Sequence, residues 1–368
     1  MEAAQPLIVL PTDVVGSIEN RTSSNQKFIV THNGRFHCDD VCAVGFLLLL
    51  PEYKNCIVVR TRDEEIIEKA DVVVDVGGVY DAENYRFDHH QKGFSEYFNS
   101  TCNVTKLSSF GQVYKFFGKR LLREIFSIPE EDVNIIYNLL YKSFVEAIDA
   151  IDNGVNITPP GVDPLYRIST DLSSRVARMN SSWNDWNPDD FISKEAFISS
   201  IRIAMEDFIF SILSYRDNWL PCKNIVYNAY KARFETHPSG YIIALELGCP
   251  FETHLEIIEE SEKRKNEENK NQEQETFKPF IPVFFVVYPD CPKKNTWRLK
   301  TVRINKSSFA SRLPIPSRFC GLRDNMLNFP GIRFVHHQGF LAGADSKESA
   351  ISLAHLTLCE ANVWHDSP

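Results

Sequence analysis

Short apolar runs alternate with longer amphipathic segments in the first hundred residues of the chain. The runs are rich in Val, Ile and Phe and are bounded by polar residues, which is typical of buried strands. Strands that alternate with helices predict an α/β fold built on a doubly wound parallel sheet. The predicted strands are residues 28–31, 56–61 and 71–78, and the helices between them are residues 41–50, ending before Pro51, and 63–70, with Asp63 as N-cap.

The pattern changes farther along the chain. Helical spacing predicts helices at residues 111–126, 131–154 with Asn153-Gly154 as C-cap, and about 190–219. Strands are predicted at residues 225–234, 241–245, 280–288 and 297–304, then a strand leading into a loop at 331–343 and a helix at 346–360. Residues 259–276 are almost free of apolar side chains, so we expect a solvated or disordered insertion, with a partner-binding segment as the alternative.

Length and composition indicate a globular protein of two domains. The chain has 368 residues, of which 43% are hydrophobic and 24% charged. We expect a flexible segment at residues 1–26, a catalytic domain at 27–220 and a smaller α/β substrate-binding domain at 221–368. The net charge of −9 excludes a general basic field for nucleic acid, so a polyanion must be held by a local patch or by metal.

Cysteine usage and hydropathy bear on the compartment. The nine cysteines include no CxxC pair, which favours reduced thiols, and Cys38 and Cys42 are interpreted as packing residues. No apolar run is long enough to cross a membrane. The first 26 residues lack the Arg-rich, acid-poor character of a transit peptide, so a cytoplasmic or nuclear location is expected.

Histidines and aspartates gather at the predicted strand ends. His and carboxylate together suit divalent ions such as Mn²⁺, Zn²⁺ or Fe²⁺, and open α/β sheets bind ligands at these ends. Each residue also has a structural reading: Asp39 could cap a helix, and Asp75 could bond the following Gly77-Gly78 turn. The candidates are His32, His37 and Asp39 after the first strand, Asp75 after the third, and Asp88, His89 and His90 beyond it.

Two further aspartates lie in the predicted helix at residues 131–154. Asp149 and Asp152 are three residues apart, so both can share one helical face. A solvated face or a helix-terminal role is the alternative.

Together these motifs resemble a known family. His-x4-His-x-Asp from His32, VDVG at 74–77, DHH at 88–90 and EAIDAIDNG at 146–154 are similar to the DHH phosphoesterase superfamily. Within it the chain resembles the melanocyte-proliferating-gene family, described as a 3′-to-5′ RNA exonuclease. Further matching stretches are 172–180, 297–304, 308–316, 321–324 and 334–340.

The resemblance implies a two-metal site. One ion would be held by His32, His37 and Asp75, and a second by Asp39, Asp75, His89 and Asp149. His90 would contact the scissile phosphate, with Asp88 as the acceptor that orients the histidines. Mn²⁺ is favoured, with Mg²⁺, Zn²⁺ or Fe²⁺ as alternatives, because His37 stands where an Asp is usual. Two such ions would activate a water molecule for hydrolysis. The resemblance also allows a mitochondrial location.

The second domain is expected to hold the substrate. Residues 298–333 are strongly basic, which predicts a phosphate grip, with a solvated basic face as the alternative. The expected substrate-binding residues are Arg298, Arg312 and Arg323, with Lys300, Arg303, Lys306, Arg318 and Arg333 also in the basic stretch. By resemblance, His336 and Gly339 join them. Arg175 and Arg178 are weaker candidates for which a structural ion pair is an equal reading.

The sequence therefore predicts a metal-dependent phosphodiesterase, most specifically a 3′-to-5′ exoribonuclease whose active site lies between two domains. Its partner would be RNA or another phosphodiester, with no membrane. One alternative is a hydrolase of a small phosphate or short oligonucleotide. Another is a non-catalytic binding protein stabilised by metal. Oligomeric state is left open.

Overall fold

The computed structural model describes residues 14–21, 23, 25–184, 194–271, 279–291, 296–305 and 308–365. Lys306, residues 272–276 of the expected insertion and most of the expected N-terminal segment lie outside this part of the chain. The chain divides into two units, Met1–Arg216 and Asp217–Pro368, each with its own sheet. The division falls close to the predicted boundary after residue 220.

The first unit contains the predicted doubly wound sheet, with strand order β2-β1-β3-β5-β4. Its strands are β1 (Phe28–Thr31), β2 (Ile57–Arg60), β3 (Val72–Val74), β4 (Tyr80–Asp81) and β5 (Arg86–Phe87). All neighbours pair in parallel except β4 and β5. The chain runs from β1 outward to β2 and then returns to the other side of β1 as β3. Strand order therefore reverses between β1 and β3, which is where such sheets bind ligands.

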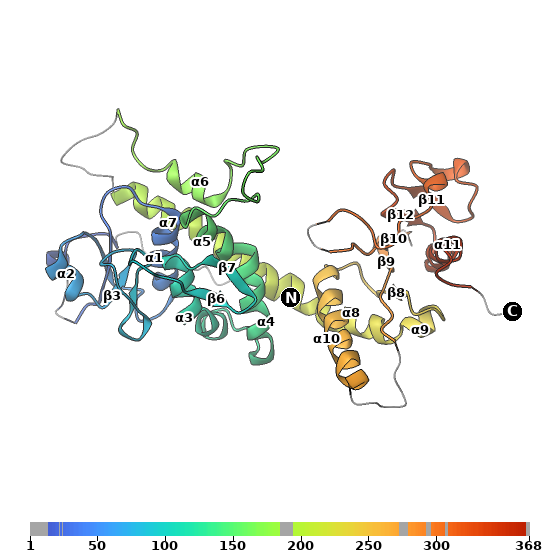
Figure 1. Ribbon diagram of the computed structural model, residues 1–368, viewed down its shortest axis with the longest axis horizontal. Coiled ribbons are helices and arrows are strands. Elements are labelled where there is room, and N and C mark those ends of the chain that lie inside the picture. Colours follow the sequence, from blue (N-terminus) through green and yellow to red (C-terminus); the bar gives the residue numbers. More distant parts are fainter. Residues whose placement is uncertain are drawn as a thin grey trace. The chain divides into compact units, whose positions relative to one another are not determined.

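Helices complete the first unit (Figure 1). The elements beside the sheet are α1 (Cys38–Leu49), α2 (Glu64–Glu68), β6 (Tyr97–Asn99), β7 (Cys102–Lys106), α3 (Ser109–Glu124), α4 (Glu130–Leu140), α5 (Glu146–Asp152), α6 (Leu172–Ala177) and α7 (Lys194–Leu213). Helix α1 is buried along its whole length and packs against α3, α7 and the sheet, which explains why its sequence is apolar on every face. Asp63 caps α2 as predicted.

The helix predicted at 131–154 is interrupted. Between α4 and α5 the chain forms a π turn, Tyr141–Val145, in which each hydrogen bond spans one residue more than in an α-helix. Asn153 ends α5, and Gly154 follows with φ +66°, in agreement with the predicted C-cap pair.

The second unit is a mixed sheet of order β11-β12-β10-β9-β8, in which only β8 and β9 pair in parallel. Helix α11 packs on β9 to β12, and α8 packs on β8 and α10 (Figure 1). The elements are α8 (Lys223–Lys231), α9 (Arg233–Thr236), β8 (Ile242–Ala244), α10 (Glu252–Asn271), β9 (Phe285–Cys291), β10 (Thr296–Thr301), β11 (Ile332–Val335), β12 (Leu341–Ala344) and α11 (Lys347–Glu360).

One prediction for this unit is wrong, and another is corrected in part. The strand expected at 225–234 is helix α8, because Val226, Ala229 and Tyr230 recur at helical spacing and are buried together. The polar run from residue 259 is helical as far as Asn271 rather than disordered, and residues 261–268 are exposed or half-buried, as the solvated reading expects. Its first residue, Glu259, is buried, which anchors this helix to the unit.

Among the described residues, no helix is both long enough and apolar enough to cross a membrane.

Candidate metal centre

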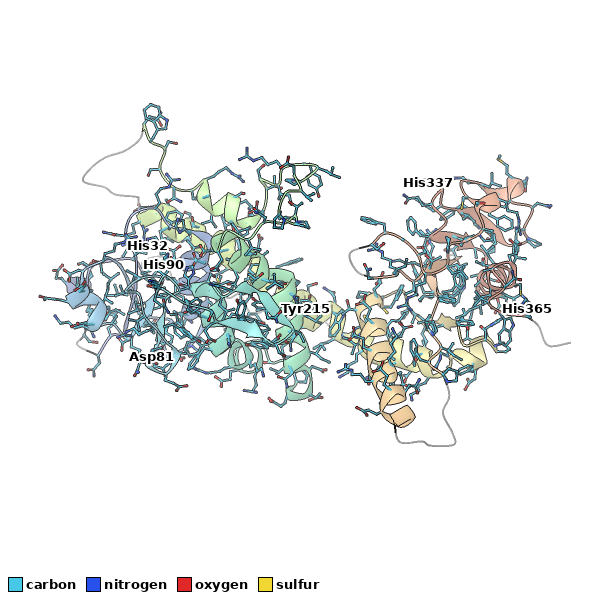
Figure 2. All side chains as sticks on the ribbon, viewed as in Figure 1. His32, Asp81, His90, Tyr215, His337 and His365 are labelled. Carbon is cyan, nitrogen blue, oxygen red and sulfur yellow. The ribbon has the colours of Figure 1, made fainter. Side chains whose placement is uncertain are left out.

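Three strand ends of the first unit bring the histidines and aspartates together. His32 follows β1, Asp75 follows β3 and Asp88 follows β5, and these strands are neighbours in the sheet. Helix α1 starts directly after His37, so its first turn carries Asp39 to the same edge. His32 and His90 lie on this side of the unit (Figure 2). The sheet topology therefore makes one site from segments that are spread over residues 32–90 of the chain.

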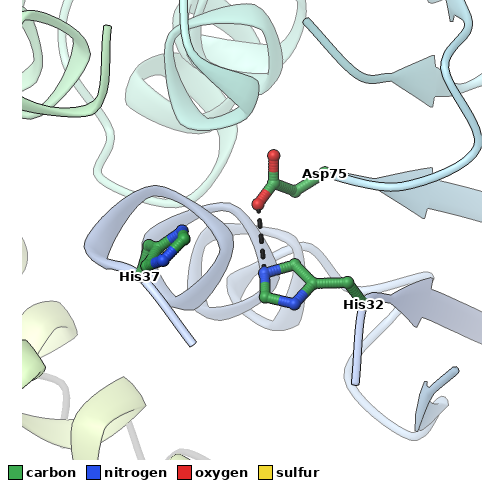
Figure 3. Close-up of side chains that lie close together, drawn as sticks. All are labelled: His32, His37 and Asp75. Carbon is green, nitrogen blue, oxygen red and sulfur yellow. Dashed lines mark ion pairs between the residues drawn. The ribbon is translucent and has the colours of Figure 1, made fainter. Parts of the chain in front are cut away.

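His32, His37 and Asp75 form the first group of donors (Figure 3). One ligand atom from each lies within 4.8 Å of the other two. The Nε2 atom of His32 is 3.2 Å from Oδ2 of Asp75. These are the three residues that the sequence proposes for one metal ion.

A second group surrounds the imidazole of His89. Its Nε2 atom lies 3.0 Å from a carboxylate oxygen of Asp152, 3.4 Å from one of Asp75 and 4.0 Å from one of Asp39. His37, Asp39 and Asp152 also have ligand atoms within 4.8 Å of one another. Asp75 therefore contributes one oxygen to each side of the site, as a bridging carboxylate would.

Several buried polar atoms at the site have no hydrogen-bond partner among the described residues. Both carboxylate oxygens of Asp39, Oδ2 of Asp40, and Nε2 of His32 and of His89 are in this state; the two imidazole nitrogens lie near carboxylates, at 3.2 Å from Asp75 and 3.0 Å from Asp152, but outside hydrogen-bond geometry. A buried polar group without a partner costs about 1–3 kcal/mol, and more when it is charged. Five such atoms in one place, all of types that coordinate metal, fit a site for divalent cations.

The pKa shifts at the site show that its carboxylates carry more negative charge than the neighbouring residues balance. Burial and the neighbouring charge of Asp75 raise the pKa of Asp39 well above its usual value. Burial alone would lower the pKa of His89, but contacts with Asp152 and Asp75 outweigh it and bring that pKa to about 10. Without metal, protons balance the excess of carboxylates, and a divalent cation can replace them.

The backbone of Asp75 has an uncommon conformation. Its φ is +55°, in the left-handed region that non-glycine residues rarely adopt. The conformation is held by the bond from Asp75 N to Phe87 O at 3.0 Å, and Ser109 Oγ donates to the carboxylate at 3.1 Å. Strain of this kind persists where the surroundings fix it, and here it accompanies the carboxylate that faces both groups.

Asp88 orients His90. The Oδ1 atom of Asp88 lies 2.8 Å from Nδ1 of His90, and its Oδ2 accepts a bond from Gly78 N at 2.6 Å. This contact with Asp88 raises the pKa of His90, whose side chain is 61% exposed. The ring nitrogen Nε2 is thus the one turned away from Asp88. His90 is also grouped with Asp75 and His89.

The structure does not bring Asp149 into any of these groups. One of its carboxylate oxygens accepts bonds from Ser108 N at 3.0 Å and Ser108 Oγ at 2.7 Å, and the other accepts from Tyr141 OH at 3.0 Å. Asp152, at the last position of α5, reaches His89 instead. The spacing of the two aspartates predicts that they share a face of the helix. It does not determine which of the two carboxylates faces the histidines.

Further residues that the sequence did not single out support the site. The side-chain amide of Asn180 accepts from Phe36 N and donates to Phe36 O, both at 3.0 Å, so it holds the loop between His32 and His37 in place. Asp40 Oδ1 accepts from His37 N at 2.8 Å, which fixes the start of α1. Its other oxygen lies 3.4 Å from His32. Asn180 ends the 172–180 motif, which is the signal that could have identified it.

The predicted phosphate grip of the second unit is largely paired with carboxylates. Arg312 forms a two-bond contact with the buried Glu259, at 2.9 and 2.7 Å, and also donates to Val283 O. It therefore serves the packing of this unit. The other pairs are Arg298 with Asp290, Lys300 with Glu252, Arg318 with Glu360 and Arg333 with Asp345.

Arg303 and Arg323 are not among these five paired bases, although Arg298 and Arg318 also lie over aromatic rings. Arg303 and Arg323 are both exposed, and their guanidinium groups lie over aromatic rings, Arg303 over Phe309 and Arg323 over Phe334. Phe309 is itself 87% exposed. Guanidinium groups over accessible rings suit single-stranded nucleic acid, which needs both charge and stacking surface.

The remaining candidates have mixed positions. Arg175 pairs with Asp207 and Arg178 donates to Ser169 O, which fits the structural reading of this pair. His336 is partly exposed beside His337. Gly339 is buried with φ +68°, and a Cβ there would lie 2.9 Å from Ile315 O, so its turn requires glycine.

The chain matches known proteins over most of its length. A family model named MYG1_exonuc and described as an uncharacterised protein family (UPF0160) matches residues 28–358. MYG1 exonuclease of Mus musculus is 40% identical over 343 residues, which is 90% of this chain and 85% of that protein. MYG1 exonuclease of Homo sapiens is 39% identical, covering 90% and 86%. MYG1 protein of Dictyostelium discoideum is 36% identical, covering 90% and 96%.

Among solved structures, the crystal structure of RecJ in complex with Mn²⁺ from Thermus thermophilus is similar at 13% identity. The match covers 92% of this chain and 53% of that chain, and its TM-score of 0.23 is too low to carry an argument. The family model and the relatives at 36–40% identity confirm the resemblance found in the sequence motifs. This chain therefore belongs to the MYG1 family.

Proposed function

We propose that this protein is a metal-dependent phosphodiesterase that degrades RNA from its 3′ end. The observation that carries the proposal is a set of histidine and carboxylate donors arranged in two groups around Asp75, in which buried carboxylate oxygens have no hydrogen-bond partner and His37 is exposed. Relatives named exonuclease support a nuclease. The preference for RNA and the 3′-to-5′ direction extend the family resemblance of the motifs.

We infer two ion sites. His32, His37 and Asp75 would hold one ion, and Asp39, Asp75, His89 and Asp152 the other. When bound, the ions would supply positive charge against the phosphate oxygens and lower the pKa of a water molecule. Three histidines among six ligand residues favour Mn²⁺, Fe²⁺ or Zn²⁺ over Mg²⁺, which prefers oxygen.

His90 is the residue proposed to contact the phosphate. Its Nδ1 is engaged by Asp88, and its raised pKa favours the doubly protonated ring. In that state Nδ1–H donates to Asp88 and Nε2–H can donate to a phosphate oxygen as negative charge develops there. Asp88 acts by fixing the ring, since its second oxygen is held by Gly78 N.

The second unit is proposed to bind the strand away from the reacting phosphate. Arg303, Arg323 and His336 are its candidate contacts, because Arg312 and four other bases already have carboxylate partners. Aromatic rings under the two arginines favour a polymer over a small phosphate.

The test is a metal-dependence assay on end-labelled RNA, end-labelled DNA and pyrophosphate. Protein freed of metal with EDTA is assayed alone and with Mn²⁺, Mg²⁺, Zn²⁺ or Fe²⁺. We expect Mn²⁺ to restore stepwise shortening of 5′-labelled RNA. Hydrolysis of pyrophosphate alone would favour a small-phosphate hydrolase, and metal binding without hydrolysis of any substrate would indicate a binding protein.

A further inference from the structure

A cavity of about 640 Å³ lies beside the metal centre, within the first unit alone. Asp75, Asp88 and His90 form part of its wall, so it opens onto the proposed phosphate position. Its volume falls within the range of about 300–1,000 Å³ that is usual for small-molecule sites. None of the metal-ligand assignments accounts for this space.

The rest of the wall comes from α2 and from the turn after β3. It combines aliphatic side chains, among them Ile67, Val76 and Val79, with the charged groups of Arg62 and Arg86 and of Glu64 and Glu68. Gly77 and Gly78 form the turn with positive φ, and a Cβ at Gly78 would meet no atom within 4 Å. The cavity is therefore lined by aliphatic side chains together with charged groups that can form hydrogen bonds.

Arg62, one of the residues that line the cavity, is held by hydrogen bonds to Asn33. Its NH1 atom donates to Asn33 O and, at 2.6 Å, to Asn33 Oδ1. Asn33 O also lies 3.0 Å from Nδ1 of the proposed ligand His32. With NH1 engaged, the guanidinium is held in one orientation, which reduces the entropy lost when its other donors bind a ligand.

Arg86 has a different role. Its NH2 atom donates to Ala70 O at 3.0 Å and its NH1 to Asn84 O at 3.1 Å, so it joins the end of α2 to β5. Arg62 is therefore the better candidate for recognising a ligand in the cavity.

We propose that this cavity holds the nucleoside attached to the reacting phosphate, with Arg62 as a residue that recognises it. The proposal rests on the proposed nuclease function and names the part of the substrate that the first unit binds. Aliphatic walls suit the faces of a base, and Arg62 can donate to its acceptor atoms. Glu64 and Glu68 would repel a second phosphate but can accept bonds from amino or hydroxyl groups.

The experiment compares AMP with ribose 5-phosphate, which has the same sugar and phosphate but no base. Binding of each to the full-length, Mn²⁺-loaded protein is measured by calorimetry. We expect AMP to bind about tenfold more tightly, and Arg62→Ala to remove most of that advantage, since bonds to a charged donor are involved. Equal binding of the two ligands to the wild type would overturn the proposal.

A second variant tests the space rather than the charge. Val79 is 50% exposed and lines the cavity, so Val79→Trp should fill it and weaken AMP about tenfold or more, while ribose 5-phosphate is less affected. Val104→Trp, at an 80% exposed position of β7, and Arg123→Ala, which breaks a surface pair with Glu130, are the matched controls. Equal AMP affinity in Val79→Trp and Val104→Trp would remove the nucleoside from this cavity.

A merely structural role of Arg62 is tested by titrating Mn²⁺. If Arg62 only positions Asn33 and His32, Arg62→Ala will weaken Mn²⁺, AMP and ribose 5-phosphate together, which contradicts the proposal. The two levels of inference also fail separately. Tight AMP binding without hydrolysis of any substrate rejects the nuclease and leaves the cavity assignment. RNA degradation with equal binding of the two ligands rejects the cavity assignment alone.

Discussion

The two units differ in whether their clustered charged side chains have partners within the fold. In the first, buried carboxylate oxygens of Asp39 and Asp40 lack hydrogen-bond partners among the described residues, and carboxylates outnumber the histidines that they face. In the second, Arg312 and four other bases meet carboxylates of the same unit. Both regions look like dense charge in the sequence. The comparison teaches that a cluster points to ligand binding when folding leaves it unsatisfied, and to architecture when folding supplies its partners.

The largest expected effect is that of Asp75→Asn. Asn has nearly the same size and tolerates the left-handed backbone, so the variant removes charge from between the two groups while keeping the fold. We expect Mn²⁺-dependent RNA degradation to fall about a thousandfold or more. Circular dichroism checks that the fold is kept. Near-normal degradation by the metal-loaded variant would refute the proposed metal centre.

The next test separates the two aspartates of α5. Asp152→Asn should weaken Mn²⁺ at least about tenfold and leave unfolding in EDTA unchanged. Asp149→Asn should keep Mn²⁺ affinity but lower the free energy of unfolding by about 1–3 kcal/mol, because Tyr141 loses its acceptor. Metal titration and denaturant unfolding of both variants give the comparison. The reverse pattern would restore Asp149 as the ligand.

Arg312→Ala probes the second unit. Glu259 would remain buried without its partner, so the free energy of unfolding should fall by about 3 kcal/mol. Adding Glu259→Gln should recover part of this loss, which denaturant unfolding of the single and double variants measures. Unchanged stability together with a flatter salt dependence of RNA binding would instead place Arg312 in the phosphate grip.

The smallest effects concern Arg303 and Arg323. Each alanine variant should reduce the slope of log affinity for single-stranded RNA against log salt by about 0.7, the value for one phosphate contact. Arg318→Ala is the control, because Glu360 already balances that charge. Binding titrations at several salt concentrations provide the measurement. A larger change of slope in Arg318→Ala than in the other two would reverse the assignment.

Local patterns are sufficient to predict part of this molecule. The strand at Phe28–Thr31 matches its prediction residue for residue, and Ser346 and Asp63 cap helices near the predicted starts. The strand-end pattern brings His32 and Asp75 to one edge of the sheet; the grouping of both with His37 is what the family resemblance implies, and the three residues lie together. Such features depend on short-range periodicity or on strand ends that parallel pairing must align.

Long-range partners could not be predicted in the same way. Glu259 and Arg312 are 53 residues apart, and the tertiary packing that brings α10 to Val283 and Arg312 joins them. For the same reason residues 259–271 looked like a solvated insertion. Asn180 lies 144 residues from the Phe36 backbone that it bonds. The choice between Asp149 and Asp152 likewise depends on tertiary contacts of Ser108 and Tyr141.

The π turn at Tyr141–Val145 has a consequence for how such sequences are compared. Each residue of a helix advances it by about 100°, so the extra residue of a π turn rotates everything after it relative to α4. This rotation sets the direction in which the side chains of α5 point, and with it Tyr141 OH donates to Asp149 and Asp152 pairs with His89. A one-residue insertion or deletion within the turn would displace both carboxylates although neither aspartate had changed. In related chains, the length of this turn is therefore as informative as the identity of the two aspartates.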